Sequence, residues 1–243
     1  MRIIFIGSVL FSKITLDTLL ELNANIVGVI TKETSSFKSD FVNLSNIAKS
    51  HNIPYLITNN VNEQNILDWV KKLDPEIIFC FGWSSLLKKE ILDITTMGVL
   101  GFHPSLLPNN KGRHPIIWAK VLSLNKIGST FFFMDEYADS GDILSQVEIP
   151  ILFEDDTNSI YNKIIEASKI QIFQFSPNLI SKKYKRIPQV NVGNTWRKRN
   201  KEDGKINFRM STNSILNLIR CLSYPYPGAH CIYNNEKIKI WKA

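Results

Sequence analysis

Short apolar runs alternate with segments of helical periodicity along the first part of the chain. Two segments with apolar residues three or four positions apart predict helices around Ile14–Leu22 and Ile66–Leu73. Strands that alternate with helices favour right-handed crossovers and a mostly parallel sheet covered on both faces. The pattern therefore predicts an α/β protein with a Rossmann-like sheet. The apolar runs that we expect to form its buried strands are Ile3–Ile6, Ile26–Ile30, Ile77–Phe81 and Val99–Phe102.

The second part of the chain has a different pattern. Two strand-like runs, Ser129–Met134 and Ile143–Ile151, predict a hairpin, and a long helical segment follows from Asn158 to about Ile180. We interpret the polar stretch 182–205 as a linker and place a domain boundary near residue 185. Residues 1–185 then form the main domain, and residues 186–243 form a C-terminal extension. The extension is expected to contain a helix near Ser211–Cys221, a turn at Tyr224–Gly228, and a hairpin of Ala229–Tyr233 and Lys237–Trp241.

Composition and charge narrow the class of protein. The chain has 243 residues, of which 44% are hydrophobic and 21% charged, which excludes a disordered protein. The net charge of +7 lies in residues 182–205, which hold nine basic and two acidic residues, while the remainder is balanced at 20 of each. A nucleic-acid protein usually spreads basic residues over a face. One cluster equally suits a nucleotide diphosphate, or a solvated connector.

Cysteine usage and hydropathy give further expectations. The three cysteines, Cys80, Cys221 and Cys231, are an odd number without a C-x-x-C pair, which argues against a disulfide framework or a zinc knuckle. No metal site is predicted. The apolar run at the N-terminus is too short for a signal peptide, and no stretch reaches the roughly 18 apolar residues of a membrane span. We therefore expect a cytoplasmic protein without membrane association.

The common nucleotide fingerprints are missing. Gly7 closes the first predicted strand, but Ser8-Val9-Leu10-Phe11 follows it in place of G-x-G-x-x-G. This disfavours a nicotinamide or flavin cofactor, because the glycines that shape the backbone for a pyrophosphate are absent. The Walker pattern G-x-x-x-x-G-K-[ST] is absent as well.

Two segments carry candidate chemistry. His103 lies in the segment Gly101–Pro115, directly after a predicted strand, and open α/β sheets bind ligands at the carboxyl ends of strands. The segment Met134–Asp142 holds four carboxylates around Gly141, with a spacing unlike that of a calcium-binding EF-hand. A carboxylate that reached His103 would fix its tautomer and raise its basicity. Local sequence does not decide whether the two segments meet.

These two motifs together resemble a known family. The run H-P-S-L-L-P-x-x-K-G starts at His103, and Asp139 of M-D-x-x-A-D-S-G-D-I-L follows 36 positions later. This arrangement resembles the 10-formyltetrahydrofolate-dependent formyltransferases, which include methionyl-tRNA formyltransferase, glycinamide ribonucleotide formyltransferase and sugar N-formyltransferases. The chain looks most like the sugar enzymes of the dTDP-4-amino-4,6-dideoxyglucose type. The transfer-RNA enzymes carry a further β-barrel domain, for which the 38 residues after the basic stretch are too few.

The resemblance implies roles for individual residues in a catalytic domain spanning residues 1–185. His103 is the expected proton shuttle, and Asp139 is expected to orient it. The family has an asparagine two positions before the histidine, where this chain has Gly101. We assign the role of that asparagine to no residue.

The resemblance also implies a folate site for the co-substrate 10-formyltetrahydrofolate. The family's pterin-binding loops match Phe81–Leu87 and Asp135–Asp142 here. An ordinary core position remains an equal alternative for the two aromatic candidates. The candidates for binding the folate are Phe81, Trp83, Leu86, Asp135 and Asp142.

A nucleotide sugar is the second expected small-molecule partner. Arg197 and Arg199 suit a diphosphate, because a guanidinium grips phosphate through two hydrogen bonds. Trp196, Tyr224 and Tyr226 are candidates to stack on a base, although the tyrosines equally suit packing against the last hairpin. The further candidates for the sugar or phosphate are Arg113 and His114.

The sequence thus predicts a sugar N-formyltransferase that serves surface polysaccharide synthesis, such as lipopolysaccharide O-antigen. We expect a homodimer, because a two-stranded ribbon is marginal alone. One alternative is a methionyl-tRNA formyltransferase-like enzyme, although nucleic acid is not the partner we expect. The other is a folate- or nucleotide-binding homologue that has lost catalysis, which the glycine at position 101 suggests.

Overall fold

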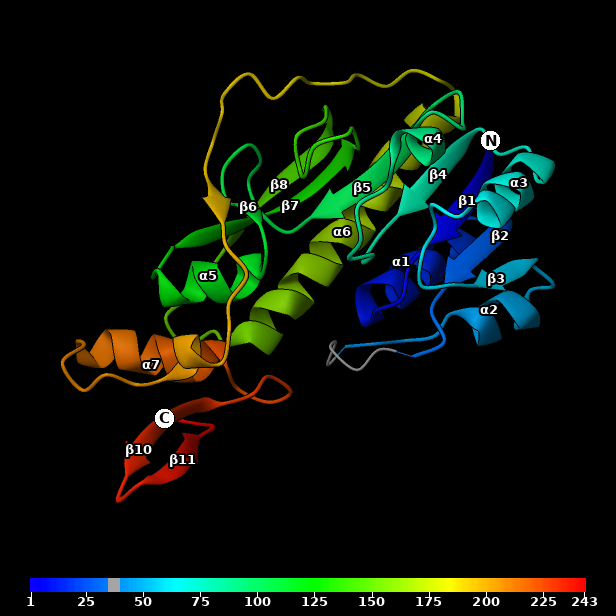
Figure 1. Ribbon diagram of the computed structural model, residues 1–243. Coiled ribbons are helices and arrows are strands. Elements are labelled where there is room, and N and C mark those ends of the chain that lie inside the picture. Colours follow the sequence, from blue (N-terminus) through cyan, green and yellow to red (C-terminus); the bar gives the residue numbers. More distant parts are fainter. Residues whose placement is uncertain (35–39) are drawn as a thin grey trace.

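The protein, described here from a computed structural model for residues 1–34 and 40–243, is built on a seven-stranded sheet (Figure 1). The strand order is β3-β2-β1-β4-β5-β7-β8. The first five strands in that order are parallel, and β7 and β8 are each antiparallel to the preceding neighbour. The strands are β1 (Arg2–Ile6), β2 (Asn25–Thr31), β3 (Tyr55–Ile57), β4 (Ile77–Cys80), β5 (Val99–His103), β7 (Lys126–Phe133) and β8 (Ile143–Pro150).

Helices cover both faces of the sheet because the residues of the central strands are apolar on both sides. Ile3 and Phe5 of β1 pack with α1, α2 and α6, whereas Ile4 and Ile6 of the same strand pack with α3 and α4. Such continuous apolar runs are typical of doubly covered parallel strands. The helices are α1 (Leu10–Glu21), α2 (Ser45–Ser50), α3 (Gln64–Lys72), α4 (Lys89–Leu92), α5 (Pro115–Val121), α6 (Thr157–Ile180) and α7 (Thr212–Cys221).

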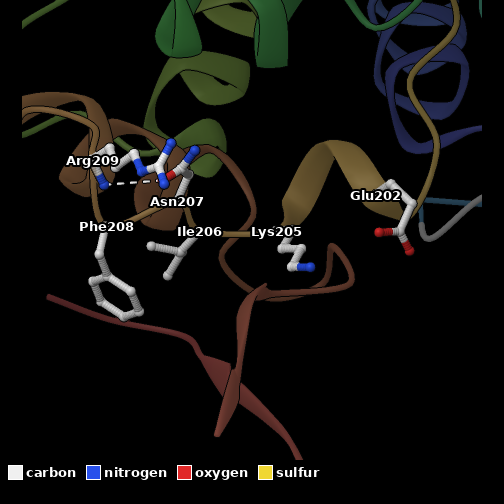
Figure 2. Close-up of a pocket in the computed structure, with 6 residues that line it drawn as sticks. All are labelled: Glu202, Lys205, Ile206, Asn207, Phe208 and Arg209. Carbon is white, nitrogen blue, oxygen red and sulfur yellow. Dashed lines mark hydrogen bonds between the residues drawn. The ribbon is translucent and has the colours of Figure 1, made fainter.

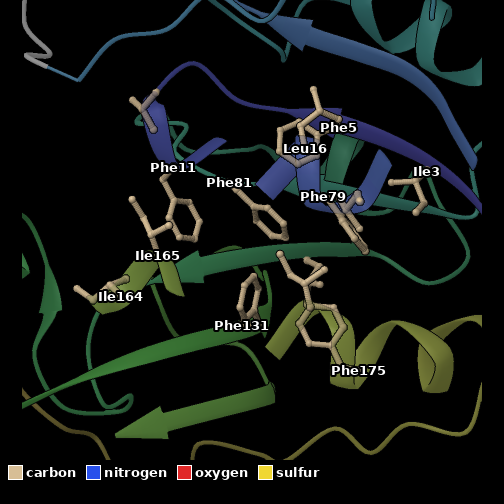
Figure 3. Packing of buried hydrophobic residues seen from close by; sticks show 14 of the residues in the cluster. Ile3, Phe5, Phe11, Leu16, Phe79, Phe81, Phe131, Ile164, Ile165 and Phe175 are labelled. Carbon is tan, nitrogen blue, oxygen red and sulfur yellow. The ribbon is translucent and has the colours of Figure 1, made fainter. Parts of the chain in front are cut away.

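Aromatic side chains pack together in the largest of the apolar core clusters (Figure 3). The ring of Phe81 lies at its centre, with its centroid 5.6 Å from that of Phe5, 5.4 Å from Phe79 and 5.2 Å from Phe131. Edge-to-face and tilted contacts of this kind stabilise a core by about 0.5–1.5 kcal/mol per pair beyond the burial of apolar area. Phe175 of α6 continues the same stack from the other side of Phe131.

The predicted fold class is confirmed. The four buried strands, the first hairpin, the long helix, α7 and the C-terminal hairpin all form within a few residues of the predicted bounds. The short elements β3, α2 and α4 were not predicted, because three to six residues give too little periodicity. Helix α5 was missed because Pro115, which closed the predicted loop, occupies the first turn of the helix, where proline is favoured.

The turn after β1 lies close against the end of β4, at the place where a doubly wound sheet usually binds a dinucleotide. A Cβ atom on Gly7 would lie 2.4 Å from Cβ of Ser12 and 2.7 Å from the carbonyl oxygen of Phe81. The Ser12 hydroxyl donates to that carbonyl at 2.5 Å and accepts from the N–H of Ser8. The turn after β1 is thus bound directly to the end of β4.

The basic stretch, residues 182–205, crosses the surface from the end of α6 to the start of the C-terminal elements, and we call it the strap (Figure 1). Most of it lacks regular secondary structure, apart from β9 (Thr195–Trp196) and the 3-10 turn η1 (Glu202–Gly204). Strand β9 pairs with the short strand β6 (Lys111–Gly112), which follows His103 in the chain. The strap therefore contacts the main domain along its course.

The C-terminal extension packs on the end of α5. Ile117 of α5 is buried together with Ile206, Leu218 and Ala229 of the extension. The two final strands, β10 (Ala229–Tyr233) and β11 (Glu236–Ile240), form an antiparallel hairpin next to α7 (Figure 1). Among the residues that the structure describes, none of the helices has the length and apolar character to cross a bilayer.

Candidate active site

His103 is the last residue of β5, and its side chain is 8% exposed. Its two ring nitrogens face two different oxygen atoms. Nδ1 lies 3.4 Å from Oδ1 of Asp139, and Nε2 lies 3.1 Å from the carbonyl oxygen of Asn110. The structure therefore brings together the histidine and the carboxylate of the two sequence motifs.

The loop that carries Asp139, residues 134–142, reaches His103 by folding back along β5. We call it the Asp139 loop. Because β7 is antiparallel to β5, the loop starts beside the amino end of β5, where the N–H of Met134 donates to the carbonyl of Val99 at 2.8 Å. Its return is possible because position 141 is glycine, where a Cβ atom would lie 1.7 Å from the carbonyl oxygen of Phe133.

A backbone contact holds the Asp139 carboxylate against the histidine. Oδ2 of Asp139 accepts a hydrogen bond of 2.9 Å from the N–H of Gly112, which leaves Oδ1 directed to His103. Asp139 itself adopts the left-handed conformation, with φ of 57°, which a short polar residue tolerates better than most. The carboxylate is therefore oriented by the segment that follows His103, residues 104–114, which we call the His103 loop.

Burial and the neighbouring oxygens act in opposite directions on the charge of His103. Burial lowers the pKa of His103, and the nearby Asp139 carboxylate and the Asn110 carbonyl offset this in part. The ring is therefore more readily neutral than a histidine in water. A neutral ring carries one proton and faces two acceptors, so it satisfies only one of them. A hydrogen-bond donor would suit the second nitrogen better than the Asn110 carbonyl does.

Gly101 lies on the same face of β5 as His103, two residues before it. A Cβ atom there would lie 2.7 Å from Cγ and 3.0 Å from Sδ of Met134, and 3.2 Å from the ring of Phe132. The Met134 side chain thus occupies the space into which a side chain at position 101 would extend. An asparagine would fit here only if Met134 moved. The packing of Met134 therefore agrees with a glycine at this position.

The folate candidates after β4 lie in different environments. The Phe81 side chain is fully buried in the aromatic core, which agrees with the core alternative for its ring, and its predicted folate contact stays a prediction. Trp83 is half-buried, with the Lys32 ammonium 4.4 Å from its ring centroid and a buried indole N–H that has no partner in the described part of the chain. Leu86 is 66% exposed.

The two acidic candidates contribute to the structure of the Asp139 loop. Oδ1 of Asp135 accepts from the N–H of Tyr137 at 2.9 Å and from the Ser140 hydroxyl at 2.5 Å. The backbone carbonyl of Asp142 accepts from the N–H of Phe133 at 2.8 Å. These contacts stabilise the loop beside His103, and the predicted folate contacts of both residues stay predictions.

Several of the predicted substrate residues gather around the start of α5. His114, the residue before the helix, is half-buried and accepts at Nδ1 from the N–H of Arg199 at 3.2 Å. Burial and the surrounding Arg113, Arg199 and Lys198 lower the pKa of His114, which favours this neutral acceptor form. Arg113 is exposed and reaches the carbonyl of Ser84, at 3.5 Å, in the loop after β4.

The two arginines proposed for a diphosphate already have protein partners. The guanidinium of Arg197 is bidentate on Asp203, which holds the pKa of that carboxyl well below its usual range. Arg199 is 9% exposed, donates to the backbone carbonyl of Asp203 at 2.7 Å and stacks over Trp118. Arg199 is thus buried and paired within the protein, and the predicted contact of the two arginines with a diphosphate stays a prediction. Trp196 lies near the same Trp118, with ring centroids 6.4 Å apart.

The two tyrosines belong to the turn between α7 and β10, outside the loops that hold His103 and Asp139. Tyr224 is 77% exposed. Tyr226 packs in the C-terminal apolar cluster, and burial raises its pKa to about 12. The packing alternative therefore describes Tyr226. A surface hollow beside the C-terminal hairpin is likewise lined by residues outside both loops, namely Glu202, Lys205, Ile206, Asn207, Phe208 and Arg209 (Figure 2).

Three contacts of the site were not anticipated from the sequence. Two of them come from the backbone, the carbonyl of Asn110 on His103 and the N–H of Gly112 on Asp139. A backbone group leaves no signature in residue type. The third comes from Gln189 of the strap, which hydrogen-bonds to the Asp139 loop and has no distinguishing pattern around it.

Fold and site together define a Rossmann-like α/β protein with a buried histidine–aspartate pair at the carboxyl end of a central strand. The family model described as formyl transferase matches residues 1–175, and that of the formyl transferase C-terminal domain matches residues 198–243. The chain therefore belongs to the formyl transferase family, a family of enzymes, as the sequence motifs predict.

Two curated relatives show how the chain compares with longer proteins. It is 34% identical over 233 residues to the bifunctional polymyxin resistance protein ArnA of Wigglesworthia glossinidia brevipalpis, covering 95% of this chain but only 36% of that protein. It is 29% identical over 249 residues to the methionyl-tRNA formyltransferase of Alkaliphilus oremlandii, covering 100% of this chain and 80% of the relative. The chain thus spans about a third of the first relative and most of the second.

A solved structure confirms the fold. WlaRD, a sugar 3N-formyl transferase crystallised with dTDP and 5-N-formyl-THF, superposes with a TM-score of 0.75 at 22% identity. The match covers 98% of this chain and 84% of WlaRD.

Proposed function

We propose that this protein is a sugar N-formyltransferase, which transfers the formyl group of 10-formyltetrahydrofolate to the amino group of a nucleotide-linked amino-dideoxy sugar. The observation that carries the proposal is the buried pair of His103 and Asp139 at the end of β5. The likeness to WlaRD, whose structure contains dTDP and a formylated folate, supports a nucleotide sugar and a folate as the two ligands.

The geometry suits a reaction in which one group first accepts and then returns a proton. The substrate amine attacks the formyl carbon, a new C–N bond forms, and the bond from the formyl carbon to the folate nitrogen breaks. The amine must lose a proton and the folate nitrogen must gain one. A buried imidazole that is neutral near pH 7 serves both steps, and Asp139 stabilises the charge that it carries between them.

The arrangement also indicates which nitrogen acts. With Asp139 at Nδ1, the proton of the neutral ring is held on Nδ1, and Nε2 is left as the acceptor. Nε2 then faces the carbonyl of Asn110, another acceptor. An amine N–H in place of that carbonyl gives Nε2 a donor, so we propose that substrate binding displaces residue 110 from His103.

The formyl donor is proposed to lie against the loop after β4 and the Asp139 loop. Trp83, Leu86, Asp135 and Asp142 remain our candidates there, and the buried indole N–H of Trp83 supports a ligand acceptor near it. Phe81 is a further candidate there, through its backbone, because its ring is buried in the core.

The nucleotide sugar is proposed to lie near the start of α5. Arg113, His114 and Trp196 are our candidates for sugar, phosphate and base, with Tyr224 as a further exposed aromatic. A diphosphate at Arg197 would compete with Asp203 for the same guanidinium. We further propose a homodimer in the cytoplasm that supplies formylated sugars for surface polysaccharide, such as O-antigen.

Turnover tests the proposal. The protein is mixed with 10-formyltetrahydrofolate and a panel of nucleotide-linked 3-amino and 4-amino dideoxy sugars, and release of tetrahydrofolate is followed together with the mass of the sugar product. We expect a formamide on at least one sugar, and a loss of about 10²–10⁴ in rate for His103→Ala. The exposed His51 provides a matched control, and His51→Ala should keep full activity. No turnover on any sugar would contradict the proposal.

Formylation of methionyl-tRNA is the second candidate, favoured by the match to methionyl-tRNA formyltransferase over 100% of the chain. It predicts binding of initiator tRNA that weakens steeply with salt, because phosphate contacts release counterions. No binding at low salt would dismiss it.

The remaining alternative, a binding protein without catalysis, is supported by the glycine at position 101 and predicts folate binding without formyl transfer to either acceptor.

A further inference from the structure

One part of the strap, residues 185–195, passes beside the Asp139 loop. From residue 185 to residue 195 every residue is exposed except Gln189, which is half-buried between Pro188 and the 87% exposed Val190. We propose that Gln189 is a positioning residue that holds the Asp139 loop, so that the carboxylate of Asp139 meets His103. The inference rests on the proposed function, for which Asp139 matters.

The amide of Gln189 binds the loop on both sides of Ser140. Its Nε2 donates to the backbone carbonyl of Asp139 at 3.1 Å and to that of Gly141 at 2.8 Å. An amide nitrogen has two protons, so both are used in these contacts. One side chain therefore fixes the two backbone groups that flank the turn, one of which belongs to Asp139 itself.

The amide oxygen of Gln189 supports the view that its amide nitrogen acts as a hydrogen-bond donor. Oε1 of Gln189 is buried and, within residues 1–34 and 40–243, has no hydrogen-bond partner. Burying an unpaired acceptor is unfavourable, because the acceptor loses its hydrogen bonds to water. A residue that only filled space would avoid this penalty with an apolar side chain, so the two N–H contacts are the reason that we assign to the amide.

The strap also binds the His103 loop, on the other side of the His103–Asp139 pair. Beyond Gln189, the carbonyl of Asn194 accepts from the N–H of Lys111 at 3.0 Å, and that of Trp196 accepts from the N–H of Arg113 at 3.1 Å. Gly112, whose N–H donates to the Asp139 carboxylate, lies between Lys111 and Arg113 in the chain. The strap thus sets the Asp139 loop and the His103 loop relative to one another from a single segment.

Other contacts of the Asp139 loop do not replace Gln189. Asp135 binds Tyr137 and Ser140 within the loop, which shapes it without placing it. The ion pair of Glu136 with Lys89 is exposed, at 3.6 Å, and such pairs contribute little. Without the Gln189 amide, the N–H of Gly112 still holds the Asp139 carboxylate, but the backbone carbonyls of Asp139 and Gly141 lose their donor, so Asp139 should shift away from His103.

The experiment compares Gln189→Ala and Gln189→Met with Val190→Ala as the matched control. Methionine keeps the length of glutamine without its donors, so it also serves if the alanine variant does not fold. The first readout is the pKa of His103 in the ligand-free protein, measured by NMR titration of the ring. Asp139 is the charged group in contact with His103 and raises its pKa, so displacing Asp139 should lower that pKa.

We expect both Gln189 variants to lower the pKa of His103 in the same direction as Asp139→Asn, and Val190→Ala to leave it unchanged. In steady-state kinetics, kcat should fall about 10- to 100-fold, as expected for a misplaced catalytic group, while KM for the formyl donor changes less than about twofold. An unchanged His103 pKa in Gln189→Met, with a shift in Asp139→Asn, would overturn the inference. The titration needs no turnover, so this result is distinct from a failure of the proposed function.

Discussion

At the scale of single residues, the chemistry of the site depends on the atoms that face the two nitrogens of His103. Asp139 provides a carboxylate at Nδ1, and Asn110 provides a carbonyl at Nε2. Burial disfavours the charged ring, and the carboxylate favours it. The result is a histidine that is neutral at rest and is stabilised when it takes up a proton.

This balance predicts the pH dependence of the reaction. The pKa of His103 is lowered from 6.5, so the neutral base is present at pH 7 and kcat/KM should fall only as the pH drops below about 6.5. Asp139→Asn removes the charge that raises this pKa, so the acid limb should move to still lower pH. The plateau rate should fall as well, by about 10²–10⁴, because the imidazolium loses its partner. A pH–rate profile checks both effects, and an acid limb that moved upward would contradict them.

At the scale of elements, the site is made by a strand and a hairpin that run in opposite directions. Strand β5 ends at His103, while the hairpin of β7 and β8 starts its loop near the other end of β5 and folds back. The fold-back brings Gly141 against the carbonyl of Phe133. Loop geometry therefore decides whether the carboxylate reaches the base.

Gly141→Ala tests this fold-back. The new Cβ atom would lie 1.7 Å from the Phe133 carbonyl oxygen, so the loop must shift. We expect a loss of about 1–3 kcal/mol in the free energy of unfolding, measured in urea, together with a strong loss of kcat. Gly204→Ala is the control, because the nearest atom to its Cβ would be the end of the Leu222 side chain, at 3.1 Å, with His230 and Gly228 in ordinary contact at 3.5 and 3.6 Å. Equal stability of the two variants would contradict the argument.

At the scale of the whole molecule, the contacts of the basic residues change how the net charge of +7 is interpreted. Within the strap, Lys182 pairs with Glu76 at 3.5 Å, Arg197 pairs with Asp203, and Arg199 is buried. Arg186 donates to the carbonyl of Met97 at 2.7 Å and stacks over Phe133. Part of the excess charge therefore fastens the strap to the main domain, and only the rest remains for an anionic ligand.

The final hairpin gives the prediction for assembly. Cys231 and Ile240 pack in the C-terminal cluster, and Tyr233 and Ile238 continue the same face outward at 66% and 44% exposure. A second copy that covered this face would bury it. Ile238→Glu should therefore convert a dimer to a monomer in analytical ultracentrifugation.

Ile232→Glu is the matched control for this prediction. Ile232 lies on the opposite face of the hairpin and is 50% exposed, so its substitution should leave the dimer intact. A wild-type protein that is monomeric at micromolar concentration would contradict the predicted homodimer.

The sequence by itself determined the elements with strong periodicity and the residues of the two motifs. Apolar runs predict buried strands because each residue of a doubly covered strand meets the core, and Ile3–Ile6 and Ile77–Phe81 show this directly. His103 and Asp139 were identified through the family resemblance that the two motifs carry. The C-terminal hairpin could likewise be predicted from its turn residues, Asn234 and Asn235.

Only the tertiary structure decided which of the candidate residues meet. The contact of Asp139 with His103 depends on the antiparallel direction of β7 and on close approach at Gly141, and neither follows from local pattern. The burial of Phe81 and Arg199 was undecided for the same reason, because exposure depends on what the distant chain places against a side chain. Gln189 is the clearest example. Its local sequence does not distinguish it from other polar residues, and its proposed role depends on the two backbone carbonyls to which its amide donates.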